Sequence, residues 1–152
     1  MKGCQNLVIM CMDFRFQISI YSWLKHRGVF GNCDVISVAG SSLNLLHDAE
    51  PKTFILNQID LAHKKHGIDK ILIFHHEDCA AVSGTPMDTE EQIRFHHEKM
   101  NLAEKVIVSY LPNVTVNKYF ISHKGQFYPS IVEHPNSAST RTSIKNSNAL
   151  RI

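Results

Sequence analysis

Two short polar motifs carry the residues of this chain with the most distinctive chemistry. The sequence CMDFR occupies residues 11–15 and the sequence HEDC occupies residues 76–79. Cys11, His76 and Cys79 offer two thiolates and one imidazole, and zinc held by three protein ligands keeps its fourth tetrahedral position for water or substrate. Because a structural site is more often closed by a fourth Cys or His, these residue types predict a catalytic Zn²⁺ site.

Asp13 and Arg15 of the first motif are candidates for tuning that site. On an extended stretch after Cys11, alternate residues share one face, so the two side chains should lie together. Arg15 can hold Asp13 ionised through a bidentate pair, and Asp13 can then accept a hydrogen bond from zinc-bound hydroxide. Two thiolates offset the charge of the cation and leave bound water less acidic, so the residues around the ligands must assist. We therefore expect Asp13 and Arg15 to be the catalytic pair.

Each motif follows a short apolar run that predicts a buried strand. The runs are residues 7–10 and 71–74, and both are rich in residues that favour strands. The two motifs therefore stand at the carboxyl ends of two strands. In open α/β sheets, ligands bind in the crevice beyond those ends, where the strand order reverses.

The rest of the chain alternates strand and helix patterns. Strands are expected at residues 7–12, 35–38, 70–74, 115–122 and 126–131. Helices are expected from Gln17 to His26, from Pro51 to a cap at Gly67, and from a capping box at Asp88 to an end before Pro112. This alternation predicts an α/β fold with a mostly parallel central sheet of about four strands, an antiparallel edge strand, and helices on both faces.

Length and composition limit the possible classes of protein. The 152 residues, 43% of them hydrophobic, suit one domain at 1–135, followed by a polar Ser-, Thr- and Asn-rich tail at 136–152. The tail is either an exposed end or an arm around a partner subunit. A net charge of +2 without a basic stripe predicts no nucleic-acid partner. The first apolar run is too short for a signal peptide or a membrane span, so we expect a cytoplasmic protein without a membrane partner.

The remaining cysteines and histidines invite less specific interpretations. Outside the motifs, Cys4 and Cys33 are expected to be inert thiols that fill space. His63 and His66 should lie on a solvated basic helix face. His96 and His97 are expected at the surface and boundary of an amphipathic helix, rather than in a second metal site or a proton shuttle.

The two motifs resemble the signatures of the β-class carbonic anhydrases, Cys-x-Asp-x-Arg and His-x-x-Cys. Residues 36–40 resemble a degraded form of the family's Arg-Asn-Ala-Gly-Asn strand end, and residues 76–81 resemble its His-Ser-Asp-Cys-Gly-Ala. Residues 116–120 and 124–127 are similar to its last hairpin. The resemblance thus covers roughly Asn6 to Ile131.

The resemblance implies hydration of carbon dioxide to bicarbonate by a zinc-bound hydroxide. Cys11, His76 and Cys79 would be the ligands, Asp13 the orienting acceptor and Arg15 its partner. In some family members the aspartate itself occupies the fourth position on zinc, and Asp13 could do the same. The family builds its pocket across a two-fold interface, so the resemblance also implies a homodimer or higher homo-oligomer.

Several departures from the family pattern leave other functions open. The chain begins almost at the first strand, where the family usually has a helical arm that contributes to the pocket. Ser37, Val38 and Ser41 replace the Arg, Asn and Asn of the middle signature, and His75 stands where glycine is usual. The bulky side chain of His75 could crowd the metal or act as a proton relay. The alternatives are a noncatalytic zinc-binding or scaffold protein, and a hydrolase of another small electrophile such as carbonyl sulfide or carbon disulfide.

Overall fold

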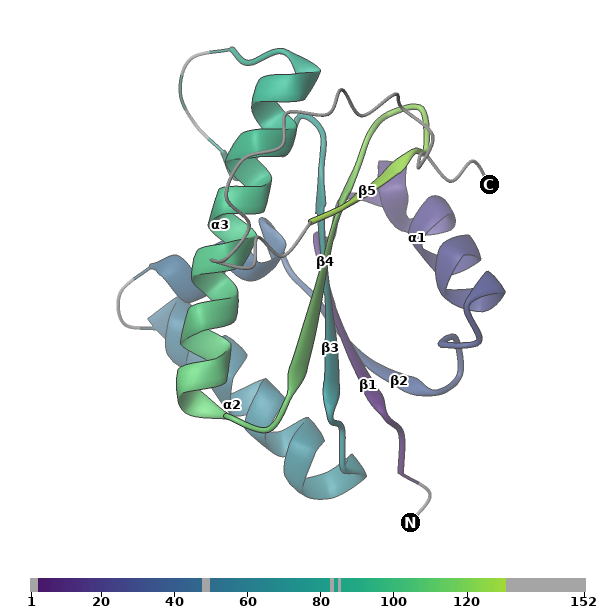
Figure 1. The fold of residues 1–152 in the computed structure, drawn as a ribbon, viewed down its shortest axis with the longest axis vertical. Helices are drawn as coiled ribbons and strands as arrows, with labels where there is room; N and C mark the ends of the chain where they lie inside the picture. Colours follow the sequence, from purple (N-terminus) through teal and green to yellow (C-terminus); the bar gives the residue numbers. More distant parts are fainter. Residues whose placement is uncertain (1–2, 48–49, 83, 85, 131–152) are drawn as a thin grey trace, which may run out of the picture.

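The structure is a computed structural model that describes residues 3–47, 50–82, 84 and 86–130. Its elements are β1 (Asn6–Met10), α1 (Phe14–His26), β2 (Cys33–Ser37), the 3-10 helix η1 (Ser41–Leu46), α2 (Glu50–His66), β3 (Lys70–His76), α3 (Thr89–Tyr110), β4 (Thr115–Ile121) and β5 (Phe127–Pro129). The five strands form one sheet in the order β2-β1-β3-β4-β5 (Figure 1). The first four strands are parallel and β5 is antiparallel to β4, which confirms the predicted fold class.

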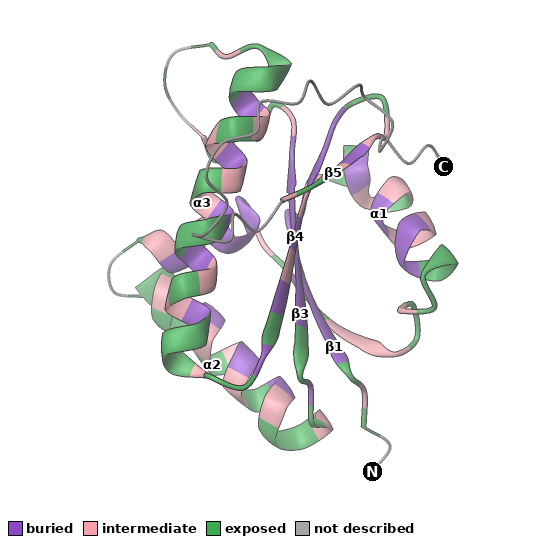
Figure 2. Cartoon of the chain, in the orientation of Figure 1, coloured by how far each residue is buried: buried purple, intermediate pink, exposed green. Residues whose placement is uncertain are grey.

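Helices cover both faces of the sheet because its central strands are apolar on both sides. All five residues of β1 are buried, and successive side chains point to opposite faces. Leu7 and Ile9 pack in one core with residues of α2 and α3, whereas Val8 and Met10 pack in a second core with α1. Figure 2 shows the buried stripe of each helix turned toward the strands.

The strand order creates the crevice that positions the site. The chain leaves β1 to form β2 on one side of it, and then crosses to form β3 on the other side. The β1–β3 pair is therefore the point at which the strand order reverses. The register pairs Met10 with Phe74, so the segments that follow these two residues emerge side by side.

Helix α1 begins three residues earlier than its apolar pattern predicts. Asp13 is its N-cap residue, and its carboxylate accepts a hydrogen bond from the backbone N–H of Arg15 at 3.0 Å. The prediction of an extended stretch through Arg15 is therefore wrong, because an aspartate that caps the first free N–H groups of a helix stabilises the helical turn. The capping box of Asp88 and Glu91 at the start of α3 is confirmed.

The predicted polar tail at 136–152, and the domain boundary before it, lie outside the described residues. Among the helices that the structure describes, none has both the length and the apolar content needed to cross a bilayer.

Candidate metal centre

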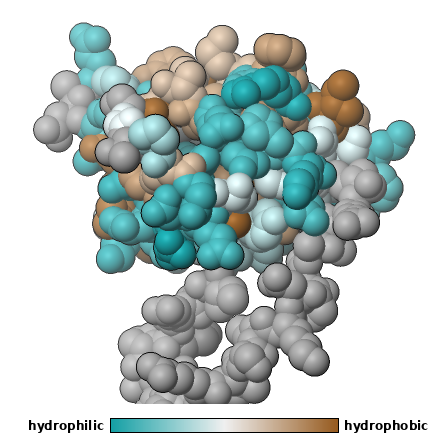
Figure 3. Space-filling model, turned by 90° about the horizontal axis from the view of Figure 1, so that it is seen from above, coloured by the Kyte–Doolittle hydropathy of each residue, from teal (hydrophilic) through white to brown (hydrophobic). Residues whose placement is uncertain are grey.

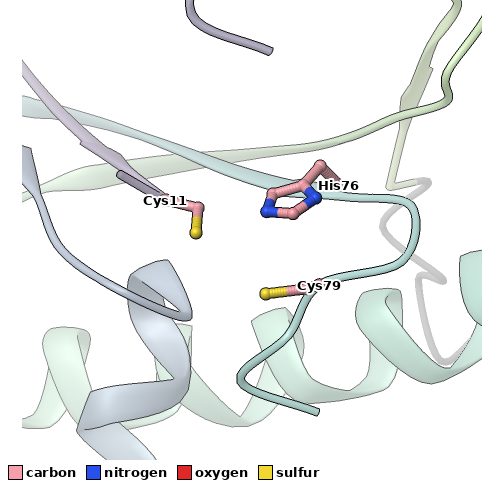
Figure 4. Close-up of side chains that lie close together, drawn as sticks. All are labelled: Cys11, His76 and Cys79. Carbon is pink, nitrogen blue, oxygen red and sulfur yellow. The ribbon is translucent and has the colours of Figure 1, made fainter. Parts of the chain in front are cut away.

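The fold brings Cys11, His76 and Cys79 together at the carboxyl ends of β1 and β3. Cys11 directly follows β1, His76 is the last residue of β3, and Cys79 lies in the turn after it. One ligand atom from each residue lies within 4.8 Å of the other two, and all three residues are buried. Both sulfur atoms and the edge of the imidazole point toward a common space (Figure 4).

His76 is oriented as a metal-binding histidine is. Its Nδ1 lies 2.8 Å from the carbonyl oxygen of Glu77, which can only accept, so Nδ1 carries the proton and Nε2 has a free lone pair. Nε2 is buried and has no hydrogen-bond partner among the described residues. A histidine that ligates a metal typically donates its other N–H to a backbone carbonyl in this way. The Phe16 ring stacks on the imidazole at a centroid distance of 4.3 Å and restricts its rotation.

The sulfur atoms of Cys11 and Cys79 lie within 4.8 Å of each other, so the two thiols influence each other's ionisation. The hydrogen bond from Cys79 lowers the pKa of Cys11, and the backbone N–H of Gly40 assists at 3.4 Å from its Sγ. The same contact, together with burial, raises the pKa of Cys79 well above its ordinary value. One thiolate therefore forms readily in this protein, whereas a cation must draw off the second proton.

These observations fit a zinc ion. Two sulfur donors and an imidazole nitrogen are ligands that zinc prefers, and three of them leave one tetrahedral position for another group. A buried nitrogen without a partner costs free energy, and coordination would remove that cost.

The turn that presents Cys79 is held by residues that the motifs alone do not reveal. Asp78 adopts a positive φ of 53°, which is unusual for a residue other than glycine. Gln92 receives a hydrogen bond from the backbone N–H of Asp78 at 2.7 Å and donates one to its carboxylate at 2.9 Å. His123 Nε2 lies 2.9 Å from the other oxygen of that carboxylate. Gln92 and His123 come from α3 and from the β4–β5 connection, so only the tertiary fold places them here.

Asp13 and Arg15 form the expected pair at the mouth of the centre. Arg15 donates from Nε at 3.0 Å and from Nη2 at 2.6 Å to the two oxygens of Asp13. These hydrogen bonds lower the pKa of Asp13 to about 2, so its carboxylate is ionised and can only accept. One of its oxygens lies 3.9 Å from His76 Nε2. Arg15 also donates to the carbonyl oxygen of Asp78 at 3.2 Å, which joins the two motifs.

His75 lies beside the metal centre in a buried chain of polar side chains, and it lines the same small hollow as the three candidate ligands. Its Nε2 lies 2.8 Å from Ser42 Oγ and its Nδ1 lies 2.9 Å from His96 Nδ1. These two hydrogen bonds fix the His75 ring beside the centre, and the crowding of the metal or the proton relay expected for His75 stays a prediction. The prediction that His96 lies at a helix surface or boundary is wrong, because His96 is 1% exposed.

The other histidines differ in how well they follow the sequence. His97 is half-buried and its Nε2 lies 3.1 Å from the carbonyl oxygen of Tyr128, as suits a boundary position. The solvated face predicted for His63 and His66 is wrong. Both are half-buried and hydrogen-bonded, His63 to the carbonyl oxygen of Ile68 and His66 to the carboxylate of Asp34.

Known structures share this fold. The chain is similar to a carbonic anhydrase from Streptococcus mutans, with a TM-score of 0.60 and 14% identity over 86% of this chain and 84% of that one. It is also similar to a β-carbonic anhydrase from Trichomonas vaginalis, with a TM-score of 0.59 and 17% identity over 86% of this chain and 85% of that one. At these identities the likeness defines the class of fold, that of the β-carbonic anhydrases.

The sequence defines the family. The family described as "Putative carbonic anhydrase" matches residues 1–132, and this chain belongs to it. Relatives include an uncharacterized protein of Rickettsia bellii, which is 27% identical over 89% of this chain and 87% of its own length. An uncharacterized protein of Rickettsia conorii is 28% identical over 82% of this chain and 71% of its own length.

Proposed function

We propose that this protein is a zinc-dependent carbonic anhydrase that hydrates carbon dioxide to bicarbonate. The observation that carries the proposal is the convergence of Cys11, His76 and Cys79 on one buried space. The Nε2 of His76, which no described residue hydrogen-bonds, is directed into that space. Cys11, His76 and Cys79 would hold the ion. Zinc, when bound, lowers the pKa of water and so supplies a nucleophile near neutral pH.

Asp13 orients the reacting water in this proposal. Its carboxylate is ionised and lies at the mouth of the centre, so it accepts a hydrogen bond from water and directs a lone pair of that water toward carbon dioxide. Arg15 is a positioning residue. It fixes both oxygens of Asp13 through two donors and thereby keeps the carboxylate from turning toward the ligands.

We further propose that the protein works as a homodimer or higher homo-oligomer. Met12, Phe14 and Ile18 flank Asp13 and are 60%, 79% and 80% exposed. Apolar side chains of this size are seldom left in water beside one another, so a second copy would cover them and wall the site. Figure 3 views the end of the molecule that holds the carboxyl ends of the strands, and apolar side chains gather along one edge of it. The related Sordaria macrospora β-carbonic anhydrases are tetrameric.

A cytoplasmic location completes the proposal. All four cysteines are free in this structure, and a reducing compartment keeps the Cys11 and Cys79 thiols available to a metal ion.

Elemental analysis combined with a rapid-mixing hydration assay tests this function. We expect zinc in the purified protein and carbon dioxide hydration well above the uncatalysed rate. A protein that is fully loaded with zinc but inactive across alkaline pH would leave a noncatalytic zinc-binding or scaffold protein. The same preparation assayed with carbonyl sulfide and carbon disulfide would identify a hydrolase of another small electrophile.

A further inference from the structure

A second group of metal-ligand residues lies at the opposite end of the sheet. Cys4 precedes β1, Asp34 is the second residue of β2, and His66 is the last residue of α2. One ligand atom from each lies within 4.8 Å of the other two, and all three residues are half-buried. The starts of β1 and β2 and the end of α2 lie toward the lower end of Figure 1, opposite the carboxyl ends of β1 and β3.

Backbone contacts hold the three residues together. The N–H of Cys4 donates to the carbonyl oxygen of His66 at 3.1 Å, which ties the chain before β1 to the end of α2. Gly3 permits this approach, because a Cβ at that position would lie 2.5 Å from the same oxygen. The parallel register pairs Asn6 with Cys33 and so fixes β2 beside β1. Preorganised ligands lose little entropy on binding an ion.

The side chains of Cys4, Asp34 and His66 hold protons that a bound cation could replace. His66 Nδ1 lies 2.6 Å from a carboxylate oxygen of Asp34, a distance that needs one shared proton. Burial raises the pKa of the Cys4 thiol, and the charge of Asp34 adds to that effect. A divalent cation would displace these protons, and the thiolate and carboxylate would balance its charge.

The donor types and the spacing suit zinc. Thiolate, imidazole and carboxylate are its three common protein ligands, whereas magnesium and calcium prefer oxygen alone. Zinc bond lengths place tetrahedral ligand atoms about 3.3–3.8 Å apart. The three atoms are already within 4.8 Å of one another, and the 2.6 Å hydrogen bond between His66 and Asp34 would open to admit the ion.

The cluster is also accessible from solvent. Asp34 and His66 line a surface hollow of about 230 Å³, together with Gln58 of α2. The hollow offers a route for the ion and space for a water molecule as fourth ligand.

We propose that Cys4, Asp34 and His66 form a second zinc site, with one position left open to water. The site ties the chain before β1 to the edge strand β2 and to the end of α2. The inference is independent of the proposed hydration of carbon dioxide, because no residue is shared with the first centre.

Metal content of cysteine variants tests the proposal. After zinc loading and gel filtration, we expect two equivalents in the wild-type protein and one in each of Cys4→Ser, Asp34→Asn and Cys79→Ser. Cys33→Ser is the matched control. Cys33 is another half-buried thiol on β2 outside the cluster, and its removal should leave two equivalents. Circular dichroism checks that each variant is folded. If Cys4→Ser does not fold, Asp34→Asn tests the second site in its place.

Cobalt supplies a second readout. In the Cys79→Ser protein, bound Co²⁺ should give thiolate-to-cobalt absorption that disappears when Cys4→Ser is added. Zinc should also raise the melting temperature of Cys79→Ser but not of the double variant.

Two results would overturn the proposal: one equivalent in the wild-type protein that Cys79→Ser abolishes, or two equivalents that persist in Cys4→Ser. One equivalent that Cys4→Ser abolishes and Cys79→Ser retains would instead refute the first centre. The two inferences therefore fail in distinguishable ways.

Discussion

Acidification should destabilise this protein through His96, which lies in the core between α3 and the sheet. Burial, together with the nearby imidazoles of His76 and His97, lowers the pKa of His96 from 6.5 to about 4. His75 of β3 faces it at 2.9 Å, and burial and the neighbouring histidines also lower the pKa of that imidazole. Both residues therefore favour the neutral form in the folded state.

The linkage between proton binding and folding sets the size of the stability loss on acidification. Between about pH 6.5 and pH 4 the unfolded chain binds a proton at His96 that the folded chain does not, so the free energy of unfolding falls as the pH falls. The pKa of His96 is 6.5 in the unfolded chain and about 4 in the folded chain, and this difference corresponds to about 3 kcal/mol of folding stability. That stability is present in full above the higher pKa and is lost below the lower one. His75 adds a loss of the same sign.

Urea unfolding of wild-type protein and of His96→Asn between about pH 7 and pH 4 measures this loss. The asparagine amide can still donate to His75 Nδ1 but does not titrate. We expect the variant to be less stable at pH 7, because it loses packing against Phe120, but to lose about 3 kcal/mol less over the acid range. A parallel series with a chelator removes the contribution of metal release.

Equal pH dependence in the two proteins would refute this reasoning, since it would mean that His96 is protonated in the folded state. A wild-type stability that does not change down to about pH 4 would refute it as well.

Three further perturbations test the site and its surroundings. Asp13→Asn should keep its zinc and lose activity by about tenfold to a hundredfold in the hydration assay, because an amide also donates and no longer orients water reliably. Ile18→Glu should shift the oligomer to monomer in light scattering, since it places a charge on an apolar surface that is 80% exposed in one copy. Gly40→Ala should cost about 1–3 kcal/mol in urea unfolding and weaken metal retention, because φ there is +76° and the new Cβ would lie 2.8 Å from that of Ala81.

Each of these variants has a matched control. Asp60→Asn removes a carboxylate from a surface ion pair with Lys64 and should keep full activity. Leu102→Glu places the same charge on α3, and a monomer in this variant too would show that the effect is not specific to α1. Gly67→Ala has the same φ of +76° with open space around it, so a loss as large as that of Gly40→Ala would exclude the contact with Ala81.

The sequence predicted the elements of the fold because the spacing of apolar residues along the chain shows directly which faces are buried. The run from Leu7 to Met10 is apolar on both sides, as a strand covered by helices on both faces must be. The motifs follow such strands, so the sequence also indicated that they meet. The prediction of an extended stretch through Asp13 and Arg15 was wrong, because Asp13 caps the N-terminus of α1 and so stabilises a helical turn at Arg15.

The two motifs give no information about the burial of His96 or about contacts made through the tertiary fold. His96 occupies a buried stripe with Gln92 and Met100, four residues to either side, so helical spacing carried a signal for its burial. The contact of His66 with Asp34 and the cluster around Cys4 depend on the register of β1 with β2 and on where α2 ends. No local spacing encodes those distances.

Zinc anomalous scattering from crystals of zinc-loaded protein tests the central claim most directly. We predict a peak within bonding distance of Cys11 Sγ, His76 Nε2 and Cys79 Sγ. Loaded crystals with no peak at this position would contradict the account, as would a disulfide that joins the two cysteines.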